Sequence, residues 1–119
     1  MSYTIKETRT VARPAAELLA IAGEVVFQLG GKRPKRPDTA GEIRADFNKA
    51  VGGAAFGNRV QLIVHAADDG SGGCTTSVEA YPIDPLGKPL QFGVIGEPAR
   101  LVTTAFWAQL DRRVKPAPA

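Results

Sequence analysis

The stretch from Phe56 to Ile83 alternates between apolar and polar positions on both sides of a short glycine-rich segment. The apolar positions recur at every second residue: Val60, Leu62, Val64, Val78 and Ala80. A period of two is that of a β-strand with one buried face. Residues 68–73 read Asp-Asp-Gly-Ser-Gly-Gly, which is the composition of a turn. The pattern therefore predicts an antiparallel hairpin with a loop over 69–73, in which Val64 faces Val78 and Leu62 faces Ala80.

Two helices are expected on either side of this hairpin. The first should run from Pro14 to Leu29, because proline suits the first helical position and Gly30 can adopt the left-handed conformation that ends a helix. Apolar residues cover most of its circumference, so a second surface besides the sheet must bury it. The second helix, which starts at Glu97-Pro98, should supply that surface. Its apolar residues are Val102, Phe106, Leu110 and Val114, with Leu101 and Ala105 alongside.

Two further strands complete the predicted fold. Alternation of Tyr3, Ile5 and Val11 with polar residues indicates a first strand. A second strand carries its apolar residues on one face: Ile43, Ala45 and Phe47. The segment Leu90–Val94 could add a short edge strand. The order β-α-β-β-β-α indicates an α+β fold, an antiparallel sheet of about four strands with two helices packed on one face.

The composition sets limits on the class of protein. A chain of 119 residues with 44% hydrophobic and 23% charged residues fits one globular domain, expected over 1–115 with a frayed tail over 116–119. The net charge of +3 permits an anionic partner without requiring one. Cys74 is the single cysteine, which favours a reducing cytoplasm. The longest apolar stretch, 18–29, is too short to span a bilayer, so no membrane insertion is expected.

Two stretches resemble a family of small bacterial proteins of unknown function. They are Phe56-Gly57-Asn58-Arg59-Val60, which enters a strand, and Pro89-Leu90-Gln91-Phe92 with Gly93 or Gly96, which leads into the terminal helix. The family resembles compact members of the START-like, helix-grip group or of the TATA-box-binding-protein-like group. It usually has a tryptophan or an acidic residue near the glycine before the last helix, where this chain has Gly93-Val94-Ile95-Gly96. The resemblance implies a curved antiparallel sheet that wraps helices, and it transfers no catalytic residue.

The leading functional hypothesis is a non-catalytic binding module for a small apolar or amphiphilic ligand. A sheet that grips a helix can leave an apolar gap, which small-molecule sites fill at ~300 Å³ or more. The expected lining is Leu62, Val78, Phe106 and Leu110. A filled interface would instead favour the alternative of a protein-interaction or homo-oligomerisation domain, in which a second chain covers the helix over 14–29.

A third hypothesis is an enzyme of polyketide-cyclase or hydratase type that uses His65 with Glu79 or Tyr81. All three residues fall on the same face of two neighbouring predicted strands. No second catalytic element completes the site, so a half-exposed structural histidine is favoured and no catalytic residue is assigned. The sequence also lacks a metal-ligand cluster or a phosphate loop, so neither a metal nor a cofactor is expected.

The basic run Lys32, Arg33, Lys35 and Arg36 is a candidate anion-binding segment, because clustered cations bind phosphate groups. No aromatic residues for base stacking accompany it, which argues against nucleic acid and favours a solvated connector. The remaining chemistry-bearing residues are given structural roles. Asp68, Asp69 and Asp84 are interpreted as turn formers, Cys74 as a small packing residue, and Trp107 as a core residue near the edge of the last helix's apolar stripe.

Overall fold

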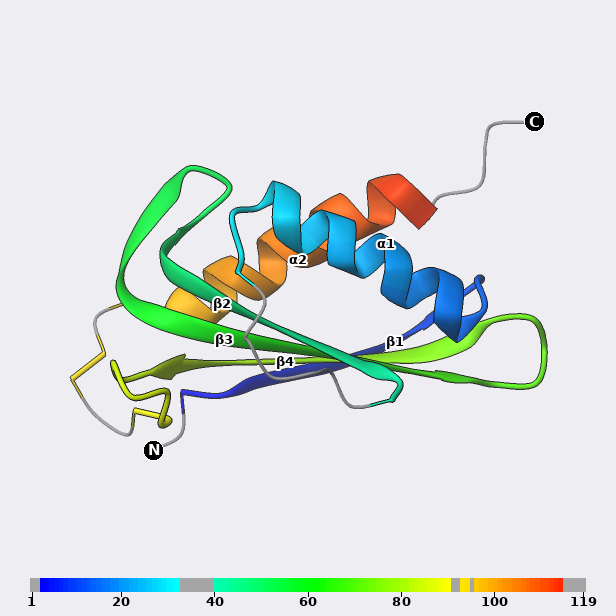
Figure 1. Cartoon of the computed structure of the whole chain (residues 1–119), viewed down its shortest axis with the longest axis horizontal. Coiled ribbons are helices and arrows are strands. Elements are labelled where there is room, and N and C mark those ends of the chain that lie inside the picture. The colour runs from blue at the N-terminus through cyan, green and yellow to red at the C-terminus, as the bar shows by residue number, and fades with distance from the viewer. Residues whose placement is uncertain (1–2, 33–39, 91–92, 95, 115–119) are drawn as a thin grey trace.

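The computed structural model of the chain describes residues 3–32, 40–90, 93–94 and 96–114. In these ranges it forms four strands and two helices, and Figure 1 shows both helices on one face of the sheet. The elements are β1 (Ile5–Val11), α1 (Ala15–Gln28), β2 (Glu42–Val51), β3 (Ala54–Asp68), β4 (Cys74–Ile83) and α2 (Pro98–Val114). The predicted fold class and element order are confirmed.

The strands are antiparallel and lie in the order β1-β4-β3-β2. Leu62 pairs with Ala80 and Val64 with Val78, as predicted from the alternation. The last pair, Asp68 with Cys74, leaves the five residues 69–73 as the hairpin loop. This register places the alternating buried residues of β3 and β4 on the same face of the sheet, the one that the helices cover.

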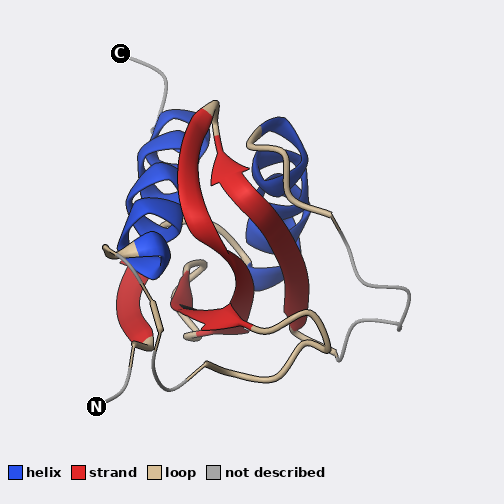
Figure 2. Cartoon of the chain, turned by 90° about the vertical axis from the view of Figure 1, so that its left-hand side faces the viewer, coloured by secondary structure: helices blue, strands red, loops and turns tan. Residues whose placement is uncertain are grey.

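A bulge bends the hairpin formed by β2 and β3. Asn48 pairs with Arg59 and Ala50 with Ala55, so Lys49 alone stands opposite residues 56–58. Such bulges increase the local bend of a sheet. In Figures 1 and 2 the two strands curve toward the helix layer, and the backbone nitrogen of Gly52 donates to the carbonyl oxygen of Leu29 at 2.9 Å. The hairpin thus closes over the end of α1.

The ends of α1 follow the expected signals with one correction. Pro14 has an extended ψ of 149°, so it precedes the helix and the first helical residue is Ala15, not Pro14. At the other end, Gly30 has a φ of 92°. Its backbone nitrogen donates to Phe27 and that of Gly31 donates to Val26. This pair of bonds is a Schellman motif, which satisfies the last carbonyl groups of the helix.

The core lies between the sheet and both helices. Its largest fully buried side chains are Phe47, Phe106, Leu18, Leu62 and Leu110. On α2 the prediction was wrong for one flank, because Leu101 is exposed and the buried face is completed by Ala99, Thr103 and Trp107. The expected burial of α1 by the sheet and α2 is observed at Leu18, Ala22, Val25 and Val26.

Two expectations concern segments that are only partly described. Of Leu90–Val94, the structure describes three residues, and the adjacent Pro89 makes a single antiparallel bridge with Ile83. The tail over 116–119 lies outside the described residues. In the described ranges, neither helix combines the length and the apolarity that crossing a lipid bilayer requires.

Candidate functional site

The four residues expected to line an apolar gap are part of a closed core. Leu62, Val78, Phe106 and Leu110 each have 0% exposed surface. No space large enough for a water molecule therefore adjoins them. Ligand binding between these four side chains stays a prediction, and the open space beside α2 lies elsewhere.

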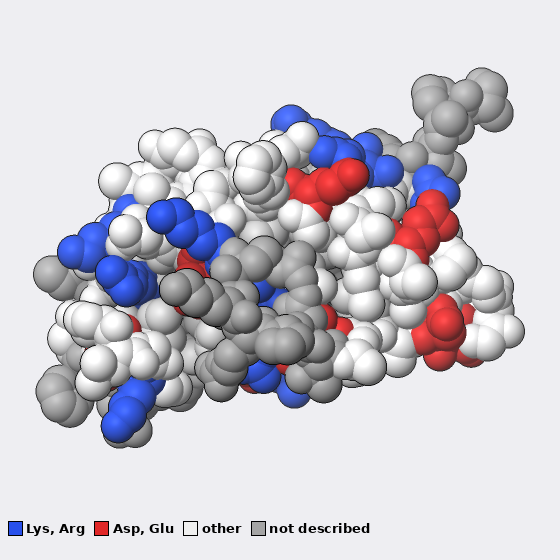
Figure 3. Space-filling view, in the orientation of Figure 1, with Lys and Arg blue, Asp and Glu red and all other residues white. Residues whose placement is uncertain are grey.

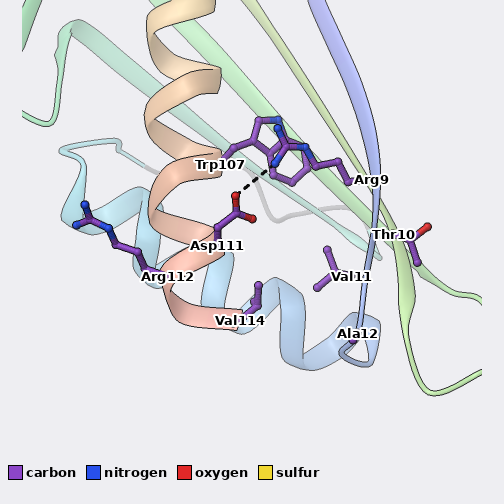
Figure 4. A pocket seen from close by; sticks show the side chains of 8 residues that line it. All are labelled: Arg9, Thr10, Val11, Ala12, Trp107, Asp111, Arg112 and Val114. Carbon is purple, nitrogen blue, oxygen red and sulfur yellow. Dashed lines mark hydrogen bonds and ion pairs between the residues drawn. The ribbon is translucent and has the colours of Figure 1, made fainter. Parts of the chain in front are cut away.

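An open pocket lies at the edge of the sheet, between β1 and the last turns of α2 (Figure 4). We call it the edge pocket. Its volume is about 450 Å³, which falls within the range of small-molecule sites. Its main lining residues are Arg9, Val11, Ala12, Trp107, Asp111 and Val114.

The register of β1 explains why charged residues reach this pocket. Glu7 pairs with Val78 and Arg9 with Thr76, and both partners are fully buried beneath the helices. Glu7 and Arg9 therefore point to the helix side of the sheet. Charges that point inward on an edge strand prevent its pairing with a foreign strand. Glu7 and Arg9 were not singled out from the sequence, although their spacing from Ile5 and Val11 places all four residues on the same face of β1.

Trp107 forms the link between α2 and β1. It is 4% exposed, and its indole Nε1 donates to Glu7 Oε1 at 3.1 Å. The guanidinium carbon of Arg9 lies 4.2 Å from the centre of the indole ring, in the geometry of a cation–π contact. The ring also packs edge-on against Phe106, with centroids 5.7 Å apart. Trp107 is thus a core residue whose polar edge is satisfied by the edge strand.

The ion pair between Arg9 on β1 and Asp111 on α2 is accessible to solvent. Arg9 Nη1 lies 3.4 Å from Asp111 Oδ2, and the two side chains are 46% and 61% exposed. Exposed pairs of this kind are weak, so the guanidinium can exchange partners at little cost. The pair uses one terminal nitrogen of a group that carries five N–H donors. An exposed cation beside the apolar Val11, Ala12 and Val114 suits a molecule that has both an anionic and an apolar part.

His65 lies on the outer face of the sheet, away from the helices. It is exposed, and its direct neighbours across the sheet are Glu42 and Ser77. Glu79 stands opposite Ile63, one step along the sheet. Within the described part of the chain, His65 makes no hydrogen bond to Glu79 or to Tyr81. The geometry offers no base held by an orienting carboxylate.

A hydrogen-bonded chain that was not predicted crosses this outer face. The hydroxyl of Tyr81 donates to Gln61 Oε1, and Gln61 Nε2 donates to Asp46 Oδ1 at 3.3 Å. It links β4, β3 and β2. Burial raises the pKa of Tyr81, so the phenol stays a neutral donor at physiological pH. Nearby, Arg44 Nε donates to Glu42 Oε1 at 2.8 Å, which raises the pKa of Arg44. These contacts stabilise the sheet surface.

The acidic residues near the turns divide into two roles. Asp69 Oδ1 accepts from the backbone nitrogen of Ser71, and Asp84 Oδ1 accepts from Leu86 and Lys88, as expected of turn formers. Asp68 was assigned wrongly, because its Oδ1 instead accepts a hydrogen bond from the backbone nitrogen of Ala15 at the start of α1.

Other predicted residues are placed as follows. Cys74 is fully buried, with its sulfur 3.3 Å from Thr76 Oγ1, and the cytoplasm as compartment stays a prediction. Lys32 exchanges two backbone hydrogen bonds of 2.8 Å with Asp46, beside β2. Arg33, Lys35 and Arg36 lie outside the described residues. Across the described ranges, no group of three or more His, Cys, Asp or Glu side chains is placed to hold a metal ion.

No protein-family model matches this sequence, and no curated protein matches it. The fold is similar to that of a structural-genomics protein from Nitrosospira multiformis, with a TM-score of 0.54, 8% identity, and coverage of 94% of this chain and 96% of that one. It is also similar to DynU16, a protein in the dynemicin biosynthetic locus, with a TM-score of 0.50 and 15% identity. That match covers 97% of this chain but 48% of DynU16, so this chain spans about half of it. At these identities the likeness shows the fold alone.

Proposed function

We propose that this protein is a non-catalytic binding module for a small amphiphilic anion, which it holds in the edge pocket. The observation that carries the proposal is a space of about 450 Å³ that places an apolar wall next to an exposed arginine. The proposal keeps the expectation of an amphiphilic ligand, and it assigns the ligand to the open space at the seam between β1 and α2 instead of to the gap expected among Leu62, Val78, Phe106 and Leu110.

The apolar part of the ligand would lie against Val11, Ala12 and Val114. Each methylene that this wall removes from water contributes about 0.8 kcal/mol. The anionic part would accept hydrogen bonds from the Arg9 guanidinium, whose planar fork matches a carboxylate. Asp111 competes for the same guanidinium, so the ligand must share or replace the contact at 3.4 Å. Arg112 adds a second cation to the lining.

Intrinsic fluorescence gives a direct test, because Trp107 is the single tryptophan of the chain and contacts the pocket. Titration with decanoate, below its micelle concentration, should change the emission of Trp107 in a saturable manner. Decyltrimethylammonium has a similar chain and the opposite charge, and it should bind much more weakly.

Two variants separate the parts of the site. Val114→Asp places a negative charge in the apolar wall, at a half-buried position in the last turn of α2, and should abolish decanoate binding. Arg9→Gln should lower the affinity for decanoate more than the affinity for decan-1-ol, which carries no charge. Lys88→Gln, an exposed cation far along the chain from the pocket, is the matched control and should bind as the parent does. An unsaturable emission change, or equal binding by Val114→Asp and the parent, would reject the proposal.

A further inference from the structure

A second hollow is lined by residues 48–49 and 57–59, on both strands of the β2–β3 hairpin where it bends. Figure 1 shows this bend and the last turns of α2 at opposite ends of the molecule. We call it the bulge pocket. Its volume is about 620 Å³. The polar residues that line it are Asn48, Lys49, Asn58, Arg59 and Asp84. Nothing in the edge-pocket proposal uses these residues.

The backbone at Lys49 is unusual in a way that concerns this hollow. Its φ is 63°, and it is the one residue other than glycine with a positive φ in the described ranges. Lysine adopts this left-handed conformation at an energetic cost that glycine does not have. Bulges re-aim side chains and are common next to binding sites. Because strained backbone of this kind clusters at binding sites, Lys49 is a candidate contact residue of this hollow.

The lining is rich in hydrogen-bond donors that the protein leaves unused. In the part of the chain that the structure describes, the side chains of Asn48, Lys49, Asn58 and Arg59 make no hydrogen bond or ion pair. Arg59 lies in register directly between Asn48 on β2 and Ile83 on β4. Figure 3 shows Lys and Arg side chains gathered over this end of the molecule.

One carboxylate also lines the pocket, but it already has partners. Asp84 Oδ1 accepts hydrogen bonds from the backbone nitrogens of Leu86 at 2.8 Å and Lys88 at 2.9 Å. These bonds hold the turn over 84–88. Asp84 therefore reduces the positive charge of the pocket without occupying the donors of Lys49 or Arg59.

We propose that the bulge pocket binds the phosphate group of a small phosphomonoester. A terminal phosphate has three acceptor oxygens, which match a guanidinium fork, an ammonium group and two carboxamides better than the two oxygens of a carboxylate do. Leu90, a half-buried residue of the lining, provides an apolar surface for the organic part.

The test uses phenyl phosphate as the probe and the full chain. Backbone amide shifts measured by NMR should move saturably for residues 48–49 and 57–59, while Trp107 emission stays constant. Benzoate should bind at least about tenfold more weakly, the factor expected from one lost charge-assisted hydrogen bond. Inorganic phosphate should bind at the same residues, and more weakly than the ester.

Substitutions at two positions perturb the pocket without threatening the fold. Lys49→Gly removes the cation and relieves the strain of the left-handed backbone conformation. It should lower the affinity for phenyl phosphate about tenfold, while the free energy of unfolding stays the same or rises. At Gly57 a Cβ atom would meet no other atom within 4 Å. Gly57→Glu should therefore fold and exclude phosphate, whereas Gly57→Gln, of the same size, should retain more affinity.

Lys88→Gln is the matched control, an exposed lysine next to the pocket that does not line it. If Lys88→Gln lowers the affinity as much as Lys49→Gly, binding is a diffuse charge effect and the proposal fails. Unchanged binding by Gly57→Glu overturns it as well. A single-stranded oligonucleotide that competes at far lower concentration than phenyl phosphate would identify nucleic acid instead. The edge-pocket proposal is tested separately by Trp107 emission and survives any of these outcomes.

Discussion

Asp68, the last residue of β3, caps the helix that begins at Ala15, 53 positions earlier in the chain. Its Oδ1 accepts a hydrogen bond of 2.7 Å from the backbone nitrogen of Ala15, the first residue of α1. Pro14 occupies the cap position and makes no side-chain cap of its own. A carboxylate at this end also interacts favourably with the helix dipole. The long hairpin and α1 are thereby joined at one corner of the fold.

Replacement of this cap should destabilise the protein. Asp68→Ala leaves the Ala15 nitrogen without its acceptor, and caps of this kind contribute about 0.5–2 kcal/mol. Asp68→Asn, which keeps an acceptor oxygen, should lose less. Urea titration of the two variants measures the difference, with Thr75→Ala on the exposed face of β4 as control. Equal stability of Asp68→Ala and Thr75→Ala would show that the cap contributes nothing.

The neighbouring Asp69 should give a pH-dependent effect. Hydrogen bonds from the side chain and the backbone of Ser71 lower the pKa of Asp69 below its ordinary value of 3.8. The folded state thus favours the ionised carboxylate, and this contribution is present above the unfolded pKa and is lost as the pH falls through the lowered one. Asp69→Asn should therefore lose less stability than the parent between about pH 6 and pH 2. NMR titration of the Asp69 carboxyl carbon checks the direction, and a midpoint above 3.8 would contradict it.

The hairpin register followed from the sequence because two constraints agreed. The alternation fixes which residues face the core, and the loop over 69–73 selects one of the few pairings that keep those faces. The sequence did not predict which flank of α2 is buried. A repeat at Val102, Phe106 and Leu110 leaves open whether the side with Leu101 or the side with Trp107 turns inward. That choice depends on how α2 crosses β1, where Arg9 and Glu7 hold the indole. The edge pocket depends on the same crossing and was therefore missed.

Two phenylalanines with opposite burial test the position of the core. Phe106 is fully buried on α2, whereas Phe27 is 80% exposed on α1. Phe106→Ala should cost about 3–5 kcal/mol, since it empties a close-packed site. Phe27→Ala should change the free energy of unfolding by less than about 0.5 kcal/mol. A large loss for Phe27→Ala that depends on protein concentration would instead support the oligomerisation hypothesis, in which a second chain covers α1.

Glu7 should stabilise the fold more through its hydrogen bond with Trp107 than through its charge. It accepts from the indole Nε1 at 3.1 Å and lies 3.4 Å from Arg100 Nη1, an exposed pair. Glu7→Met removes the acceptor and leaves an N–H group of a nearly buried side chain without a partner, at a cost of about 1–3 kcal/mol. Glu7→Gln keeps an acceptor oxygen and loses the weak ion pair, so it should cost less than about 1 kcal/mol.

The matched control is Lys6→Met. It introduces the same residue, methionine, one position earlier, on the exposed outer face of β1. Methionine then affects strand propensity similarly in both variants, so the difference between them reports the contacts of Glu7 with Trp107 and Arg100. Glu7→Gln loses only the ion pair, and it therefore separates the two contacts. Urea titration followed by Trp107 emission reads both stability and the environment of the indole. Glu7→Met should show the lower midpoint and a shifted native emission maximum. If it matches Lys6→Met in both, the link between β1 and α2 is held by Arg9, through its contacts with the Trp107 ring and with Asp111, and Arg9→Gln should then give the larger loss of stability.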